Sequence, residues 1–191
     1  MDLQRQELLK QIKENAITFG NFVLSSGATS HYYLDCRKVT LSPHGAWLIA
    51  NQLLDLLADL DFDALGGPTL AADPIAASVA VESWHRQRPV RAFIVRKETK
   101  GHGLQRQVEG PLRSSDQVVV VDDTLTTGGS ILQAIDAVEK AGATVVAVAV
   151  VIDRLQGGTE AIGQKGYPVR SLFTFDDIRD YVEQRQTNES A

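Results

Sequence analysis

Two aspartates lie between a run of valines and a cluster of hydroxyl residues and glycines in the stretch VVVVDDTLTTGGS, residues 118–130. The valines predict a buried strand, and TTGGS before an apolar segment predicts the start of a helix. Backbone N–H groups, hydroxyls and a helix N-terminus together suit a phosphate dianion. The stretch lacks the lysine of a Walker A loop and the spacing of G-x-G-x-x-G, so it predicts a site for one phosphate rather than a triphosphate or a dinucleotide.

The two acids, Asp122 and Asp123, would repel a phosphate placed beside them. Carboxylates accept hydrogen bonds from sugar hydroxyls and ligate hydrated Mg²⁺ through oxygen, so a phosphorylated ribose explains both parts of the stretch. Near an anomeric carbon the same charge would stabilise an oxocarbenium-like transition state. The alternative is structural, because Asp-Asp can end a strand in a turn and TTGGS can cap a helix.

A second polar segment, VRKETKGHGLQRQVEG, follows another predicted strand and is too long for an ordinary connection in an α/β unit. Long loops of this kind often act as lids. Clustered cations would neutralise the charge that develops on a departing diphosphate, and closure would keep water from a cationic sugar. A solvated charged loop is the alternative. The cations are Arg96, Lys97, Lys100, His102 and Arg106, of which His102 can either protonate or bind a leaving group.

From Pro43 onward the sequence shows alternating helix and strand patterns, which would position the acidic stretch and the basic segment. Strands rich in Val and Ala, separated by helices, predict the α/β class with an open, mostly parallel sheet covered by helices on both faces. Ligands bind beyond the carboxyl ends of such strands, so GGPTLAADP, the basic loop and DDTLTTGGS should converge. The expected helices are 42–60, 74–86, 128–142 and one from about 176, and the expected strands are 62–67, 90–95, 117–123, 143–153 and 169–175.

A separate cap precedes this alternation. Leucines and isoleucines at helical spacing between Leu3 and Ile17 predict an amphipathic helix, and NFVLSSGATSHYYLD predicts two short strands around a Ser-Gly turn. The whole chain of 191 residues, 43% of them hydrophobic, suits one domain with one substantial core.

Composition excludes several classes of partner. A net charge of -5 without a basic field argues against nucleic acid and against an anionic membrane surface. The longest apolar run, residues 145–152, is far shorter than the ~20 residues of a membrane helix. A single cysteine, Cys36, and a first segment without the apolar core of a signal peptide predict a reducing, cytoplasmic location.

The acidic motif and the upstream RKETKGHG together resemble the type I phosphoribosyltransferases, and FGNFVLSSGATSHYYLDCRK resembles the hood that orotate phosphoribosyltransferases place over the base. The resemblance spans almost the whole chain. It implies the type I phosphoribosyltransferase fold as one domain over 1–191, with a hood of about 1–40 plus the C-terminal segment and a core of about 41–155. It also implies transfer of ribose 5-phosphate from 5-phospho-α-D-ribose 1-diphosphate to N1 of orotate, giving orotidine 5'-monophosphate and diphosphate in UMP biosynthesis.

The resemblance also implies roles for individual residues. Lys100, His102, Asp122 and Asp123 would be catalytic. The implied donor site comprises Arg96, Lys97, Lys100, His102, Asp122, Asp123, Thr124, Leu125, Thr126, Thr127, Gly128, Gly129 and Ser130. Thr126, Arg154 and Tyr33 would hold orotate, with the guanidinium on its carboxylate. Mg²⁺ would be carried mainly by the substrate's diphosphate and ribose, and the lid would complete the site of the neighbouring subunit in a homodimer.

Two positions depart from the family pattern. Many relatives have a lysine where this chain has Ser25 and another where it has Ala71. The second change leaves the diphosphate with one fewer cation, and Asp73 nearby adds negative charge, so weaker affinity for the donor is expected. Trp47 and Trp84 stand at apolar positions of predicted helices, which favours core or dimer packing.

Two other functions remain compatible with the sequence. One keeps the phosphoribosyl donor and changes the acceptor to a purine or to uracil. The other is a non-catalytic regulator on the same fold that binds RNA and senses nucleotides, although the acidic balance of the chain argues against a basic groove for RNA.

Overall fold

A computed structural model, which describes residues 2–23, 29–97 and 107–189, contains a six-stranded sheet and a separate two-stranded hairpin. The strand order of the larger sheet is β5-β4-β3-β6-β7-β8, and its members pair in parallel except for the short antiparallel edge strand β5. The strands are β3 (Ala64–Pro68), β4 (Arg91–Val95), β5 (Val108–Glu109), β6 (Gln117–Leu125), β7 (Thr144–Asp153) and β8 (Val169–Thr174). The predicted open, mostly parallel α/β sheet is confirmed.

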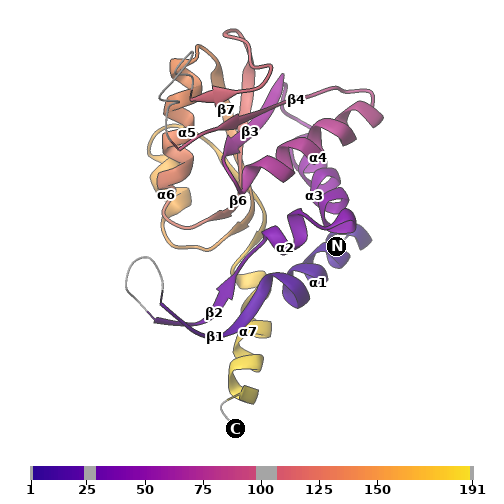
Figure 1. Ribbon diagram of the computed structural model, residues 1–191, viewed down its shortest axis with the longest axis vertical. Coiled ribbons are helices and arrows are strands. Elements are labelled where there is room, and N and C mark those ends of the chain that lie inside the picture. The colour runs from indigo at the N-terminus through magenta and orange to yellow at the C-terminus, as the bar shows by residue number, and fades with distance from the viewer. Residues whose placement is uncertain (1, 24–28, 98–106, 190–191) are drawn as a thin grey trace.

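Two layers of helices cover this sheet (Figure 1). Alternate valines of β6 face opposite sides: Val119 and Val121 pack in the cluster with helices α1, α3 and α4, whereas Val118 and Val120 pack in the cluster with α5 and α6. All four valines are fully buried, which explains why the strand is continuously apolar. The helices are α1 (Leu3–Gln11), α2 (Arg37–Thr40), α3 (Pro43–Leu56), α4 (Ala72–His85), α5 (Gly129–Lys140), α6 (Gly158–Gly163) and α7 (Asp176–Glu189).

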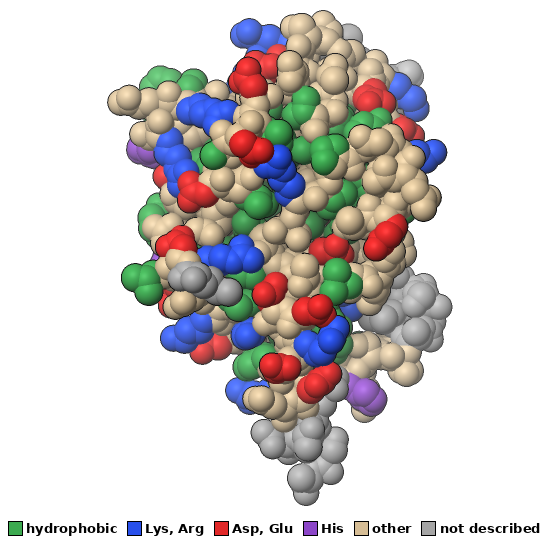
Figure 2. Space-filling model, turned by 180° about the vertical axis from the view of Figure 1, so that it is seen from behind, with side chains coloured by type: hydrophobic (Ala, Val, Ile, Leu, Met, Phe, Trp, Pro, Cys, Tyr) green, Lys and Arg blue, Asp and Glu red, His purple; other side chains and the backbone are tan. Residues whose placement is uncertain are grey.

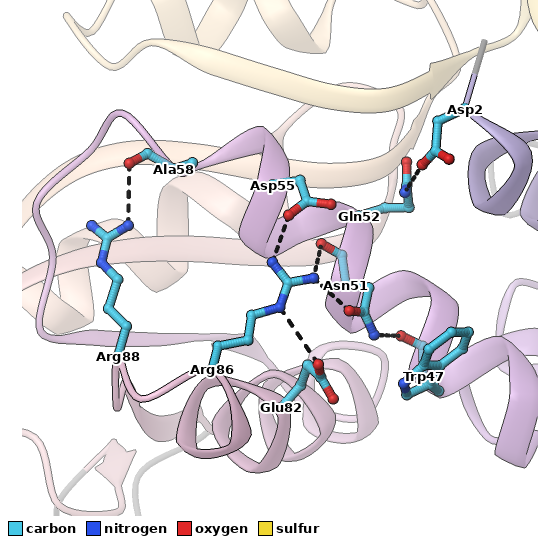
Figure 3. A network of polar contacts seen from close by, with 9 residues as sticks. All are labelled: Asp2, Trp47, Asn51, Gln52, Asp55, Ala58, Glu82, Arg86 and Arg88. Atoms are coloured by element: carbon cyan, nitrogen blue, oxygen red, sulfur yellow. Dashed lines mark hydrogen bonds and ion pairs between the residues drawn. The ribbon is translucent and has the colours of Figure 1, made fainter.

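Helices α3 and α4 pack side by side and are joined at one end by a polar network (Figure 3). Arg86, just after α4, donates to Asp55 of α3 at 2.5 Å and to the side chain of Asn51. Glu82 approaches the same guanidinium at 3.5 Å. At the other end of α3, Ser42 accepts from the N–H of Gly45 and Pro43 occupies the first turn, so the sequence itself specifies where this helix begins.

A hairpin of β1 (Ile17–Val23) and β2 (Thr29–Leu34) lies beside α7, away from the main sheet (Figure 1). We call it the hood hairpin. Two ring contacts join it to the C-terminal segment, Phe19 with Tyr181 and Tyr32 with Phe175. The two strands predicted here are confirmed, while Ser25 lies outside the described residues. The predicted helix is too long, because a π-helical turn (η1, Ile12–Ala16) ends it and the β-branched and aromatic residues after it form β1.

Several short elements differ from the sequence prediction. The glycine-rich segment 156–168, expected to be a connection, contains α6, which begins after the left-handed Gly157. Strand β6 continues two residues past Asp123, because Thr124 and Leu125 pair with β7. Trp47 and Trp84 are 44% and 73% exposed, so of the predicted core or dimer packing the core alternative is wrong for both, and dimer packing stays a prediction. No helix in the described ranges is long and apolar enough to cross a membrane.

Candidate active site

The loops that follow β3, β4 and β6 meet at the carboxyl edge of the sheet and enclose a pocket of about 790 Å³. The chain passes from β3 to its neighbour β4 and then crosses to β6 on the other side of β3, so this edge is a topological switch point. Open α/β sheets bind their ligands at such points. The predicted convergence is confirmed for residues 68–71, 96–97 and 122–131, and the hood hairpin adds a wall through Tyr33 and Leu34.

The acidic pair lies at the bottom of this pocket in a position that disfavours ionisation. Asp122 is 6% exposed, and its carboxylate accepts from the N–H of Asp123 at 2.9 Å and from the hydroxyl of Ser130 at 3.5 Å. Burial, followed by the charge of Asp123, raises the pKa of Asp122 to about 7. Burial also raises the pKa of Asp123, against the lowering effect of its hydrogen bonds with Thr124. A ligand that donates hydroxyl hydrogens therefore meets acceptors that water solvates poorly.

The hydroxyl-glycine turn stands beside the acids at the N-terminus of α5. Gly128 has φ +84, which glycine adopts without steric cost, and a Cβ there would lie 3.2 Å from Ile162 Cγ1. The next position, Gly129, is open, with nothing within 4 Å of a Cβ added there. The lining residues from this turn are Thr126, Thr127, Gly128, Gly129 and Ser130. Small residues and a helix N-terminus thus leave N–H groups and hydroxyls accessible to an anion.

Two predicted donor residues of β6 differ in what they expose. Thr124 lines the pocket beside the acids. Leu125 also borders it, but its side chain is fully buried in the core cluster with α5 and α6. Leu125 therefore offers no side-chain contact to a ligand.

Cations reach the pocket from the segment after β4. Arg96 and Lys97 both line it, and Arg96 lies 3.8 Å from Glu109 of β5. Lys100, His102 and Arg106 lie outside the described residues. Across the pocket, Ala71 immediately precedes α4 and contributes no charge. The neighbouring Asp73 accepts a hydrogen bond from the Thr69 hydroxyl at 2.7 Å, so part of its carboxylate is engaged by the protein.

Sequence reasoning missed one charged pair in the pocket. Asp35 accepts from Arg37 Nε at 2.7 Å and from its Nη2 at 3.1 Å, and both residues line the pocket. The hydrogen bonds with Arg37 lower the pKa of Asp35 despite partial burial. The charge of Arg37 also acts to lower the pKa of Asp123. Their position directly after the hood strand, in YYLDCRK, was the available signal.

The residues predicted for the acceptor come from three segments. Thr126 and Tyr33 line the pocket, and Tyr33, 43% exposed, packs against Phe22 of β1. Arg154 follows β7, and its N–H donates to the carbonyl of Leu125 at 2.9 Å. Its guanidinium contacts Tyr32 of the hood hairpin, with Nη2 3.3 Å from the hydroxyl. Arg154 is therefore adjacent to both the hood hairpin and the end of β6.

Comparison with known proteins agrees with this geometry. Residues 48–166 match the phosphoribosyl transferase domain family. The chain is 52% identical to the orotate phosphoribosyltransferase of Streptomyces coelicolor over 171 residues, covering 90% of this chain and 93% of the relative. The enzyme of the same name from Aquifex aeolicus is 41% identical over 92% of this chain and 98% of the relative.

A solved structure gives the same result. The orotate phosphoribosyltransferase of Mycobacterium tuberculosis H37Rv in complex with 5-phospho-α-D-ribosyl 1-diphosphate (PRPP) superposes with a TM-score of 0.79 at 37% identity. The superposition covers 92% of this chain and 98% of that one. The fold, the pocket and these similarities show that the chain belongs to the orotate phosphoribosyltransferases, a family of type I phosphoribosyltransferases.

Proposed function

We propose that this chain transfers ribose 5-phosphate from PRPP to N1 of orotate, forming orotidine 5'-monophosphate and diphosphate for UMP biosynthesis. In this reaction the bond between the anomeric carbon and N1 forms on one face while the bond to the diphosphate oxygen breaks on the other. The observation that supports it best is the acidic pair, with Asp122 buried, beside the hydroxyl-glycine turn in a pocket that the hood hairpin borders. Arg154 is not among the residues that line this pocket and contacts the hood hairpin at Tyr32. Family membership supplies the identity of the substrates.

The acidic pair would accept hydrogen bonds from the ribose hydroxyls. Asp122 is buried and Asp123 is partly buried, so a sugar replaces few water contacts when it binds. Their negative charge would then stabilise the positive charge that develops at the anomeric carbon. With Lys100 and His102 on the leaving-group side, these four residues form the proposed catalytic set.

The turn at the start of α5 would hold the 5-phosphate. Thr126, Thr127 and Ser130 supply hydroxyls, and Gly128 and Gly129 keep the backbone N–H groups unobstructed. A phosphate at this point also gains from the dipole of α5, which has 12 residues.

The diphosphate would lie between the segments after β3 and β4. Arg96, Lys97, Lys100 and His102 are the proposed cations, and Ala71 leaves the β3 side without one. Arg37 lines the same pocket and is a further positive charge there. We therefore expect donor affinity to depend strongly on the cations that follow β4.

Orotate would bind between the hood hairpin and the end of β7. Its carboxylate suits the guanidinium of Arg154, and Thr126 and Tyr33 border the space for the ring. Arg154→Ala tests the choice of acceptor. Orotate use should fall at least 100-fold, whereas an unchanged rate would favour a purine or uracil as the true acceptor.

Mg²⁺ fits the donor set of this pocket in one particular way. The described residues contain no group of three or more His, Cys, Asp or Glu side chains that could hold a metal ion. Asp122 and Asp123 provide hard oxygen ligands beside the proposed ribose site, so an ion bound there would take its remaining ligands from substrate and water. Bound Mg²⁺ would neutralise charge on the diphosphate as it leaves.

A homodimer is the proposed assembly, with the segment after β4 completing the partner's site. Trp47 and Val81 help to line a groove between α3 and α4. Several apolar side chains on and near these helices are exposed. They are Leu41 (70%), Trp47 (44%), Val81 (62%) and Trp84 (73%). An exposed apolar surface of this kind is typical of an interface. Light scattering on Val81→Glu/Trp84→Glu should give a monomer, and a persistent dimer would place the interface elsewhere.

We place the whole chain in one domain, with a hood of about 1–40 plus the C-terminal segment and a core of about 41–155. A cytoplasmic location agrees with Cys36 as a buried free thiol.

An RNA-sensing regulator is disfavoured by the surface. Figure 2 shows acidic and basic side chains interspersed over the face opposite that of Figure 1. The described residues on this face form no continuous basic field, and the chain as a whole carries a net charge of -5, which disfavours binding of a nucleic acid. Salt-sensitive RNA binding at micromolar protein would overturn this part of the proposal.

A further inference from the structure

The guanidinium of Arg154 has one side-chain hydrogen bond within the described ranges, and that bond goes to the hood hairpin. Arg154 Nη2 donates to the Tyr32 hydroxyl at 3.3 Å, and Arg154 Cζ lies 5.8 Å from the centroid of the Tyr32 ring. Arg154 Nε is buried and has no acceptor among the described residues, and no described carboxylate forms an ion pair with this arginine. The direction of the guanidinium therefore depends on Tyr32.

Tyr32 is in turn fixed by the C-terminal part of the chain. Its ring stacks on Phe175 with centroids 6.0 Å apart and planes at 21°. The N–H of Phe175 donates to the carbonyl of Asp153 at 2.8 Å, one residue before Arg154. The guanidinium is thus anchored at the end of β7 through its own backbone. The phenol of Tyr32 is anchored at the same place through the stacked ring of Phe175.

The turn that carries Arg154 is also held from its own side. The buried carboxylate of Asp153 accepts from the N–H of Leu155 at 2.8 Å and from the Thr159 hydroxyl at 2.6 Å. These bonds fix the backbone on both sides of Arg154 and leave its long side chain as the variable part. An arginine side chain loses much rotamer entropy when it is immobilised, so a partner that orients it in advance strengthens ligand binding.

Strand geometry separates the roles of the two neighbouring tyrosines. Successive side chains of β2 point to opposite faces of the hairpin. Tyr33 lines the pocket, whereas Tyr32 contacts Arg154 and Phe175. The residue that borders the space for the base and the residue that orients the arginine are therefore adjacent in sequence but distinct.

We propose that the Tyr32 hydroxyl is a positioning group that fixes the guanidinium of Arg154 for the carboxylate of the acceptor base. By accepting from Nη2, the hydroxyl holds the plane of the guanidinium and leaves its other N–H groups for two parallel hydrogen bonds to a carboxylate. This inference rests on the proposed function, because it requires an acceptor with a carboxylate. Tyr32 itself need not touch the substrate.

The test is Tyr32→Phe, which keeps the ring that stacks on Phe175 and removes only the hydroxyl. The KM for orotate should rise about 3- to 10-fold, the range expected for the loss of one hydrogen bond of ordinary strength, with kcat and the KM for PRPP within about 2-fold of wild type. Tyr167→Phe is the matched control, since its hydroxyl donates to Glu139 at 2.7 Å and it does not line the pocket. That variant should keep the wild-type KM for orotate.

A second variant tests the contacts from Phe175 through Tyr32 to Arg154 while keeping the Tyr32 hydroxyl. Phe175→Leu removes the stacking partner of Tyr32 and should raise the KM for orotate in the same direction, by about 2- to 3-fold. An unchanged KM for orotate in Tyr32→Phe would overturn the positioning role. Equal rises in the KM of both substrates, with a lowered Tm, would also overturn it by assigning Tyr32 to general stability.

The wild-type assay separates the two levels of the proposal. If the wild-type protein does not consume orotate with PRPP, the proposed function fails and the role of Tyr32 fails with it. If wild type is active and Tyr32→Phe is indistinguishable from it, the function stands and only the positioning role is wrong.

Discussion

The backbone N–H of Asp123 donates to Asp122 Oδ1 at 2.9 Å, so the first carboxylate of the acidic pair is turned back toward the peptide of the second. This bond and the longer one from Ser130 do not offset burial, which raises the pKa of Asp122 to about 7. Near neutral pH the carboxyl group is therefore divided between its two protonation states. Both stability and activity should report this titration.

Asp122→Asn should stabilise the protein at high pH. Because the folded pKa of Asp122 lies above the usual value of 3.8, the folded state binds the extra proton between about pH 4 and 7. The stabilising effect of that proton is present below pH 4 and is lost as the pH rises through 7. The variant lacks this loss, so its free energy of unfolding should exceed that of wild type above pH 7, by up to about 4 kcal/mol.

Urea unfolding at pH 5, 6, 7 and 8 measures this difference directly. The advantage of Asp122→Asn should grow with pH and level off above about 7.5. A difference that does not depend on pH would mean that Asp122 titrates normally in the folded protein.

Arg37→Leu should move the acid limb of the pH profile. The charge of Arg37 lowers the pKa of Asp123, whereas Asp35 raises it. Removing Arg37 leaves both Asp35 and Asp123 without this cation, so the pKa of Asp123 should rise. The acid limb of kcat/KM should therefore shift to higher pH.

Arg37→Lys is the matched control for this shift, because it keeps the charge and loses the fork that binds Asp35. Its acid limb should return most of the way to that of wild type. An acid limb that stays in place in Arg37→Leu would show that the pair formed with Asp35 does not act on Asp123.

Gly128→Ala should destabilise the protein through its backbone. Gly128 has φ +84, and a Cβ there would lie 3.2 Å from Ile162 Cγ1, so the expected cost is about 1 to 2 kcal/mol. Gly129→Ala is the stability control, because its Cβ would meet nothing within 4 Å. Thermal unfolding should separate the two variants, and equal Tm values would contradict a strained position at residue 128.

Mixing two inactive proteins should restore activity if the segment after β4 acts in the partner's site. Lys100→Ala and Asp123→Asn would each abolish turnover, but a hybrid dimer would contain one site with both residues intact. Activity should therefore recover in proportion to the hybrid fraction. Failure to recover at any ratio, with subunit exchange verified by mass spectrometry, would contradict a shared site.

The sequence predicts the central sheet well because buried strands and amphipathic helices leave strong patterns. The valines before Asp122 and the capped start of α3 at Ser42 are examples in which the residue types determine the element. The acidic pair and the turn at Gly128 were predicted as neighbours because they are adjacent in the chain. Short elements such as α6 were missed, since six residues between glycines carry too little periodicity to distinguish a helix from a loop.

Contacts between distant segments were the harder part of the site. The approach of Tyr32 to Arg154 joins residues 122 positions apart, and no local pattern encodes it. Asp35 and Arg37 likewise look like ordinary surface charges in the sequence, because only the folded position of the hood hairpin places them in the pocket. The exposure of Trp84 has a similar cause, because helical periodicity identifies an apolar face without showing whether the same chain covers it.

The most direct measurement of the central claim is orotate consumption, followed at its ultraviolet band with Mg²⁺ and with or without PRPP. Adenine, hypoxanthine and uracil serve as parallel acceptors with the same protein. The account predicts loss of orotate that requires PRPP, with no comparable reaction of the other bases. Absence of reaction with orotate in a folded, dimeric sample that still binds PRPP would contradict it.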